Sequence, residues 1–91
     1  MENSVGTFVP EDVFRITGRG WVLAGTLAGQ VAPGNLLVFA SGISLLIKGV
    51  EMLNRRQRTD TIGLLVAADF ASHQEFTDHG IMGATAQVVA G

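Results

Sequence analysis

The sequence has no cysteine and few charged residues, and both shortages exclude classes of function. Without cysteine the chain cannot form a disulfide framework, a thiolate zinc site, an iron–sulfur cluster or a cysteine nucleophile. Charged residues make up 15% of the chain, against about 25% in an average soluble domain. The net charge is only −2. Non-specific nucleic-acid binding needs many Lys and Arg side chains on phosphates, so this chain is a poor candidate for it.

Lysine occurs once, as Lys48 between Ile47 and Gly49. A phosphate-binding P-loop needs the pattern GxxxxGK[ST], so binding of a nucleoside triphosphate in that way is excluded. The longest mostly apolar run, residues 36–47, has 12 residues, whereas a membrane span needs about 18. The first ten residues lack the basic and apolar regions of a secretory signal. We therefore expect a cytoplasmic protein that does not span a membrane and holds no cofactor.

Twelve glycines punctuate short apolar runs, which is typical of an all-β chain with tight turns. The 91 residues fit one domain, in which residues 1–8 form an extension or an edge strand. Pro33 and Gly34 occupy the central positions of a predicted type II turn. Closure into a barrel is favoured because it removes exposed strand edges. The expected strands are residues 13–17, 21–27, 36–39, 43–52, 61–68 and 81–89, with a helical turn at 71–76.

Five short motifs occur in a fixed order along the chain: DVFRITGRG at 12–20, Val22 with Gly25, Pro33 with Gly34, KGVEM at 48–52 and IGLL at 62–65. Together they resemble the second domain of elongation factor Tu and its relatives among translation GTPases, over about residues 9–83. The resemblance implies a closed six-stranded Greek-key barrel. The GTPase domain of that family is not part of this sequence, so we do not expect this chain alone to deliver transfer RNA.

In elongation factor Tu this domain helps to hold the aminoacylated 3′ end of transfer RNA. By resemblance, Glu11, Asp12 and Phe14 lie beside the amino-acid pocket, and Glu51 packs against the terminal adenosine. Thr61 stands where the family usually has asparagine. The sequence also departs from the family by Leu53 in place of an aromatic residue, by a loop at 54–60 about four residues shorter, and by a segment at 66–79 about three residues longer.

The carboxylates also have simpler interpretations. Glu11 and Asp12 are adjacent, so in a regular strand they point to opposite faces and do not form a catalytic pair. Asp12 is expected to accept backbone hydrogen bonds at the start of a strand. Glu51 lies in an otherwise apolar strand, where a buried carboxylate needs a partner such as Arg19 or Lys48. A structural ion pair or an exposed strand face is the alternative to a functional role.

Arg55, Arg56 and Arg58 form the densest positive cluster, which could contact an anion or RNA or simply belong to a solvated loop. The segment with His73, Glu75, Asp78 and His79 has metal-ligand residue types. Its two histidines are too far apart to share an ion, whether on a helix or on a strand. A polar loop without a metal is expected there. Trp21 follows a turn, and we expect it to cap the barrel.

The favoured hypothesis is a stand-alone, non-catalytic barrel that acts as a binding or assembly module. The charge-poor surface predicts that it associates with itself or with another protein. The alternative is an accessory factor that contacts RNA with a remnant of the 3′-end pocket, built from Glu11, Phe14, Glu51 and the arginine loop. A small hydrolase has no motif to support it.

Overall fold

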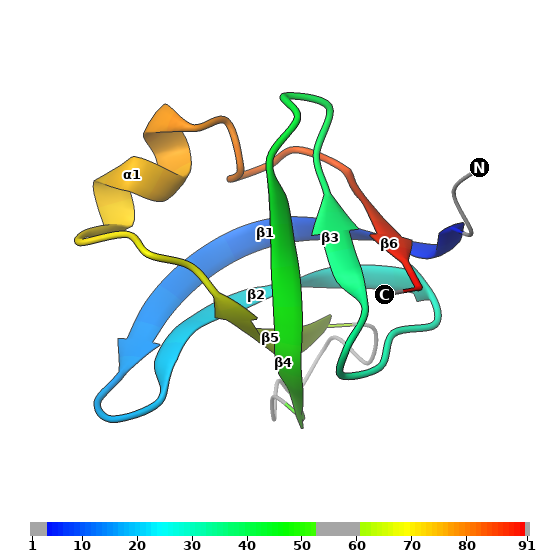
Figure 1. Ribbon diagram of the computed structural model, residues 1–91, viewed down its shortest axis with the longest axis horizontal. Coiled ribbons are helices and arrows are strands. Elements are labelled where there is room, and N and C mark those ends of the chain that lie inside the picture. Colours follow the sequence, from blue (N-terminus) through cyan, green and yellow to red (C-terminus); the bar gives the residue numbers. More distant parts are fainter. Residues whose placement is uncertain (1–3, 53–60, 91) are drawn as a thin grey trace.

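The computed structural model describes residues 4–52 and 61–90, and in this part of the chain it is an all-β structure with one short helix (Figure 1). The strands form one antiparallel sheet that closes on itself in the order β1-β2-β5-β4-β3-β6. The all-β prediction with six strands is therefore confirmed. The elements are β1 (Ser4–Ile16), β2 (Gly20–Gly29), β3 (Leu36–Val38), β4 (Ser44–Met52), β5 (Thr61–Ala67), α1 (His73–Asp78) and β6 (Ala86–Val89).

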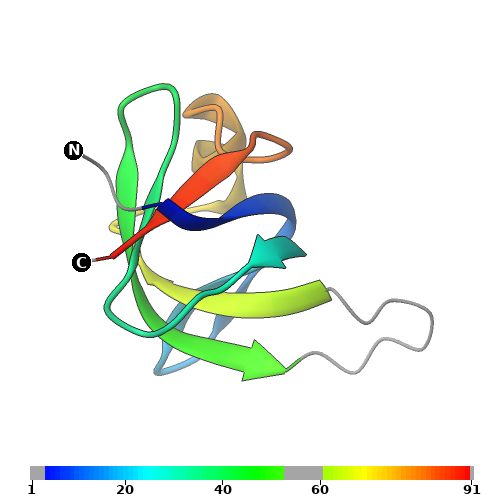
Figure 2. The same ribbon diagram turned by 90° about the vertical axis from the view of Figure 1, so that its right-hand side faces the viewer.

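Strand β1 is longer than predicted and closes the ring. It starts at Ser4 and pairs with β2 on one edge and, through residues 4–8, with β6 on the other. In Figure 2 the strands curve around a common interior, with β1 and β6 side by side. The first residues of the described chain are thus part of the sheet.

Two turns contain glycines whose backbone conformation other residues rarely adopt. Gly34 has a φ of +96°, and the Asn35 N–H donates to the carbonyl of Ala32 at 3.1 Å. This geometry confirms the predicted turn with Pro33 and Gly34 at its centre. The β1–β2 hairpin uses Gly18 and Gly20 in the same way, with φ values of +81° and +118°.

Another glycine, Gly25, allows β1 and β2 to approach each other closely. It pairs with Pro10, and a Cβ added at Gly25 would overlap the backbone of Val9. Gly49 on β4 is different, because a Cβ there would meet Leu65 at an ordinary contact distance of 3.8 Å. Close backbone approach therefore explains the glycine at position 25 but not the one at position 49.

All six strands contribute to one hydrophobic core. Each strand contributes to this core at least one side chain with no exposed surface. Burying a side chain of this size stabilises the fold by about 1.5–3 kcal/mol. These side chains are Phe8, Leu23, Leu37, Ile47, Leu64 and Val88. The alternation of inward and outward side chains along each strand then decides which residues form the outer surface.

Helix α1 closes one end of the ring through aromatic contacts. Phe76 of the helix is fully buried and its ring lies 5.1 Å from that of Trp21, centroid to centroid. The Trp21 indole N–H donates to the carbonyl of Phe70 at 3.0 Å. Trp21 is only 3% exposed, which agrees with its predicted position as a cap.

Two predicted boundaries near the C-terminus were wrong. The helix spans His73–Asp78 rather than 71–76, because Ser72 is its N-cap residue and its N–H donates to the Glu75 carboxylate at 3.1 Å. The last strand begins at Ala86 rather than at residue 81. Ile81 is instead fully buried in the core, and the Gly83 N–H donates to the carbonyl of Pro10 at 2.8 Å.

Candidate functional site on the outer face of strands β2 and β5

Three apolar side chains form a row on the outside of the barrel, which we call the apolar strip: Phe14, Val22 and Leu65. Phe14 is the direct partner of Val22 across β1 and β2, and Val22 is the partner of Leu65 across β2 and β5. Five of their chain neighbours belong to the core, so the strip faces outward: Val13, Trp21, Leu23, Leu64 and Val66. Val22 is nevertheless fully buried and Leu65 is only 7% exposed. Neighbouring side chains therefore cover this outward row.

A second row runs beside the strip and has a carboxylate at each end. Asp12, Ala24, Gly63 and Glu51 are partners in register across β1, β2, β5 and β4. The two middle residues are small, so this row is shallow between its acidic ends. Three strand spacings separate Asp12 from Glu51, about 14 Å, which is too far for the two carboxylates to share a proton.

Glu51 pairs with Arg19 across this face. The Arg19 guanidinium donates to Glu51 Oε2 at 3.1 Å, and the two side chains are 52% and 31% exposed. Arg19 lies in the β1–β2 turn, whereas Glu51 is on β4, so the pair reaches over the outside of β5. The prediction of Arg19 as the partner is correct, and the carboxylate lies on an exposed strand face. An exposed pair of this kind contributes only about 0–1 kcal/mol to stability.

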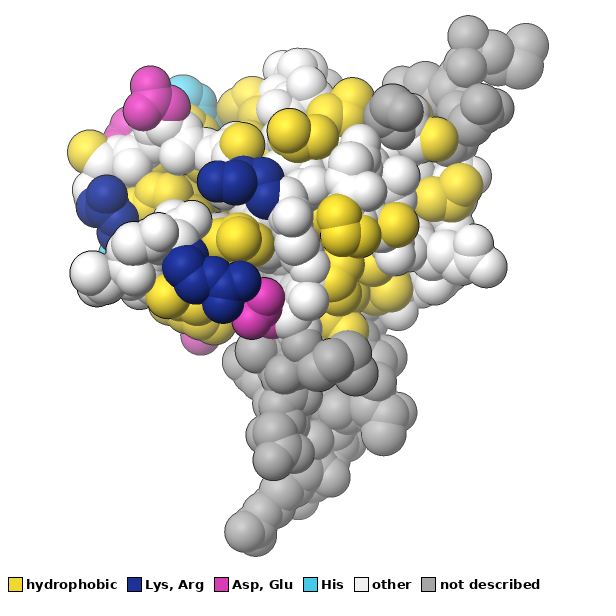
Figure 3. Space-filling view, turned by 60° about the horizontal axis from the view of Figure 1, so that its bottom comes forward, with side chains coloured by type: hydrophobic (Ala, Val, Ile, Leu, Met, Phe, Trp, Pro, Cys, Tyr) yellow, Lys and Arg dark blue, Asp and Glu magenta, His cyan; other side chains and the backbone are white. Residues whose placement is uncertain are grey.

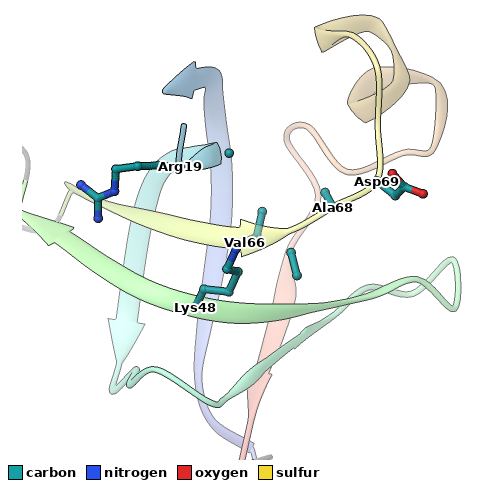
Figure 4. Close-up of a pocket in the computed structure, with 7 residues that line it drawn as sticks. Arg19, Lys48, Val66, Ala68 and Asp69 are labelled. Atoms are coloured by element: carbon teal, nitrogen blue, oxygen red, sulfur yellow. The ribbon is translucent and has the colours of Figure 1, made fainter. Parts of the chain in front are cut away.

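A hollow of about 360 Å³ lies beside the strip (Figure 4). Residues of the β1–β2 turn, of β4 and of the end of β5 line it: Arg19, Gly20, Lys48, Val66, Ala67, Ala68 and Asp69. Lys48 is the extra residue of a β-bulge, since its neighbours Ile47 and Gly49 pair with the consecutive residues Val66 and Leu65. In Figure 4 the Lys48 side chain lies between that of Arg19 and the segment leading to Asp69.

Figure 3 shows part of this surface from outside. Basic side chains border an apolar area, and an acidic side chain lies beside one of them. The described part of the hollow combines two cationic side chains, Arg19 and Lys48, with the carboxylate of Asp69 at its far side. Such a surface offers an apolar floor together with groups that bind an anion.

Glu11 and Asp12 do not point to opposite faces, and the expectation that they would was wrong. A bulge in β1 between Pro10 and Asp12 adds Glu11 to the strand, so both carboxylates follow the buried, inward Pro10 on the outer side. The Thr26 hydroxyl donates to Glu11 at 2.8 Å. The Val13 N–H donates to Asp12 Oδ1 at 2.9 Å, so Asp12 accepts a backbone hydrogen bond as predicted.

Thr61 belongs with Glu11 rather than with the strip. It is 3% exposed and is the register partner of Thr26, whose hydroxyl bonds Glu11. Within the described residues the Thr61 hydroxyl has no hydrogen-bond partner. The sequence-predicted site residues thus fall into two groups: Phe14 in the strip with Asp12 and Glu51 in the row beside it, and Glu11 with Thr61 farther along β1 and β5. Arg55, Arg56 and Arg58 lie outside the described residues.

Sequence reasoning did not identify Val22, Leu65 or the position of Lys48. A signal was present for the first two, because the runs 21–24 and 64–66 are apolar without alternation, which indicates strands covered on both faces. No signal marked Lys48, since a bulge depends on how two strands pair. The histidines of the 71–79 segment pack against aromatic rings: His73 lies edge-on to Trp21 at 5.1 Å, and His79 stacks on Phe70 at 5.0 Å.

Two further findings concern the chain as a whole. Within residues 4–52 and 61–90, no helix is long and apolar enough to cross a membrane, and no group of three potential ligands could hold a metal ion. A scan against protein-family models and a search of curated proteins found no match to this chain. The function must therefore be argued from the geometry of the outer face.

Proposed function

We propose that this chain is a non-catalytic binding module and that its fold is the Greek-key barrel of the second domain of translation GTPases. The strand order supports the fold. Strands β3, β4 and β5 are neighbours in sequence and in the sheet, and β6 returns through a long connection to lie beside β3, which is the arrangement of a Greek key. Four of the five motifs that carry the resemblance lie on β1, β2, β4, β5 and the β1–β2 turn, and the Pro33-Gly34 motif lies in the connection between β2 and β3.

The observation that carries the binding function is an outward apolar strip beneath an exposed ion pair and beside a hollow. Binding sites combine an apolar surface, which supplies most of the affinity, with a few polar groups that fix orientation. Phe14, Val22 and Leu65 provide the first, and Arg19, Lys48 and Glu51 provide the second. The ligand class that fits has a flat apolar part and an anionic group.

The Arg19–Glu51 pair opens at little cost. Since the pair contributes only about 0–1 kcal/mol, a ligand that inserts over Leu65 loses little by separating it. Once separated, the guanidinium can bind the anionic group and the carboxylate can accept a hydrogen bond from the flat part. The guanidinium then exchanges one anionic partner for another and the carboxylate exchanges the guanidinium for a neutral donor, so neither is left without an interaction.

The acidic groups of this face are arranged for binding rather than for proton transfer. Asp12 accepts a backbone N–H, Glu51 is paired with Arg19, and about 14 Å separates the two. A general acid and base that act together must both reach the same reacting group by hydrogen bonds of about 3 Å. This distribution is our reason for proposing a non-catalytic role.

The test is a titration of the protein with adenosine 5′-monophosphate, observed through the methyl signals of Val22 and Leu65 by NMR. We expect saturable shifts centred on these two residues, and a weaker affinity for Lys48→Ala. Adenosine without its phosphate should bind wild type and Lys48→Ala alike. Shifts centred elsewhere, or none at millimolar nucleotide, would contradict the proposed site.

A second candidate function is contact with the 3′ end of RNA. The resemblance assigns Phe14 and Glu51 to the 3′-end pocket. This function is favoured because Phe14 belongs to the apolar strip and Glu51 lies beside it, on the same strand as Lys48. RNA oligonucleotides ending in adenosine or in uridine should be compared, with Glu51→Gln as the variant. A preference for adenosine that Glu51→Gln removes supports this function. Equal binding of both ends leaves only the general binding module.

A further inference from the structure

The opposite side of the ring has an outer surface of a different kind. Strand β3 is opposite β2 in the order β1-β2-β5-β4-β3-β6, and it lies between β4 and β6. Where these three strands pair with one another, their outward side chains are mostly apolar and form what we call the β3 face: Leu36, Val38, Ser44, Leu46, Gln87 and Val89.

Side chains on the β3 face are open to solvent. Leu46 is 44% exposed and Val5, in β1 beside Val89, is 40% exposed; these are the two most exposed large apolar side chains of the described residues. Leu36, Val38 and Val89 are partly exposed. No long side chain of the described residues covers Leu46 in the way that outward Val22 is covered.

The β3 face also lacks charge. The sequence has no Asp, Glu, Lys or Arg between Arg19 and Lys48 and none after Asp78. The charged residue closest along β4 is Lys48, which lines the hollow beside β5. Figure 3 shows the same division, since charged side chains lie to the left and the described surface to the right holds only apolar and uncharged groups.

We infer that the β3 face binds a second copy of this chain. In a two-fold symmetric contact the residues nearest the axis meet their own copies, so a charge at the centre of the face would meet a like charge. Because all the described residues of the β3 face are uncharged, no like charges repel each other in such a contact. Its apolar row of Leu46, Leu36 and Val89, three direct neighbours in register, can face its own copy.

The size of the surface agrees with a dimer. The protein measures 35 × 30 × 22 Å, so one whole side, which includes the β3 face and the residues around it, offers on the order of 700–1,000 Å². A stable protein–protein interface takes about 800 Å² from each partner. A charged partner such as RNA would find no complementary group among the described residues here, whereas a second copy is complementary in both hydrophobicity and charge.

The experiment is sedimentation equilibrium on the wild-type chain from about 1 to 500 µM, with Leu46→Glu as the test variant. The mass of the wild type should rise from one chain to two with concentration. Leu46→Glu should raise the dissociation constant at least about tenfold, because two carboxylates then face each other. Ser44→Glu tests the same face at an exposed polar position and should act in the same direction without removing an apolar side chain.

Thr17→Glu is the matched control, since it adds the same charge at an exposed turn on the other side of the ring. It should associate like the wild type. A wild type that remains a single chain over the whole range overturns the inference, and the face would then fit a different uncharged protein. Association that both β3-face variants leave unchanged overturns it too. Nucleotide binding at the strip should persist in Ser44→Glu, whose register partner is Val38, so the two proposals can fail separately.

Discussion

The outer faces of β2 and β3 follow the same alternation but differ in what covers their apolar side chains. On β2 and β5 the outward residues Val22 and Leu65 are buried, because they lie beside Phe14 and under the reach of Arg19 and Glu51. On β4 beside β3, outward Leu46 is nearly half exposed. Long charged side chains can cover apolar surface with their stems. Where such residues are missing, only another molecule can cover it.

Three leucines test this comparison most strongly, because replacing each of them by alanine should reduce the free energy of unfolding by a different amount. Leu64→Ala removes a fully buried core side chain and should reduce the free energy of unfolding by about 3 kcal/mol. Leu65→Ala, on the outer face, should cost about 1–2 kcal/mol, and Leu46→Ala less than about 0.5 kcal/mol at a concentration where the chain is monomeric. Denaturant unfolding measures all three. Equal costs for Leu64 and Leu65 would contradict the assignment of inner and outer faces.

The next largest loss of stability is expected where the backbones of β1 and β2 approach each other closely. Gly25→Ala should destabilise by about 2–3 kcal/mol, because the added methyl group meets the backbone of Val9. Gly49→Ala is the matched control on β4, where the new methyl group has room beside Leu65. It should leave stability nearly unchanged or slightly raised. Thermal unfolding of the two variants compares them directly, and a costly Gly49→Ala would show that β4 and β5 approach more closely than described.

The ion pair over the strip should contribute little to stability. A double-mutant cycle of Arg19→Ala and Glu51→Gln should give a coupling energy of about 0.2–1 kcal/mol, which decreases as salt is added. The same two variants should alter nucleotide binding at the strip but leave dimerisation at the β3 face intact. A coupling energy well above this range would mean that the pair is a fixed structural element and not an easily opened cover.

The smallest effect is expected at Thr61. Thr61→Val replaces a buried hydroxyl that has no partner within the described residues by a methyl group of similar size. Because an unpaired buried polar group is costly, stability should rise by up to about 1 kcal/mol. Guanidinium unfolding can resolve this change. A loss of stability would reveal a hydrogen bond to this hydroxyl.

Much of the fold followed from local sequence signals. The pair Pro33 and Gly34 predicted its turn because the two residues favour the backbone angles of that turn. Apolar runs located β2, β3, β4 and β5 to within two residues, whereas β1 begins nine residues earlier and β6 five residues later than expected. Residues 4–8 carry no strong strand signal of their own. They are held by pairing with β2 and β6.

The candidate site was less predictable because its geometry depends on β-bulges. A single extra residue at Glu11 brings both neighbouring carboxylates to the outer face, and another at Lys48 adds a cation to the border of the hollow. Bulges arise from the pairing of two strands that are distant in sequence, so neither segment reveals them alone. The pairing of Arg19 with Glu51 was predictable from charge, but the face on which it lies was not.

The pairing of β1 with β6 also has a consequence for how the chain folds. Ser4 is the register partner of Val89, so the ring closes only when the first and the last strands meet. Contacts between such distant residues carry a large loop-closure entropy and slow folding. During synthesis the barrel therefore cannot be completed until nearly the whole domain has left the ribosome. Until β6 pairs with them, β1 and β3 each have one unpaired strand edge.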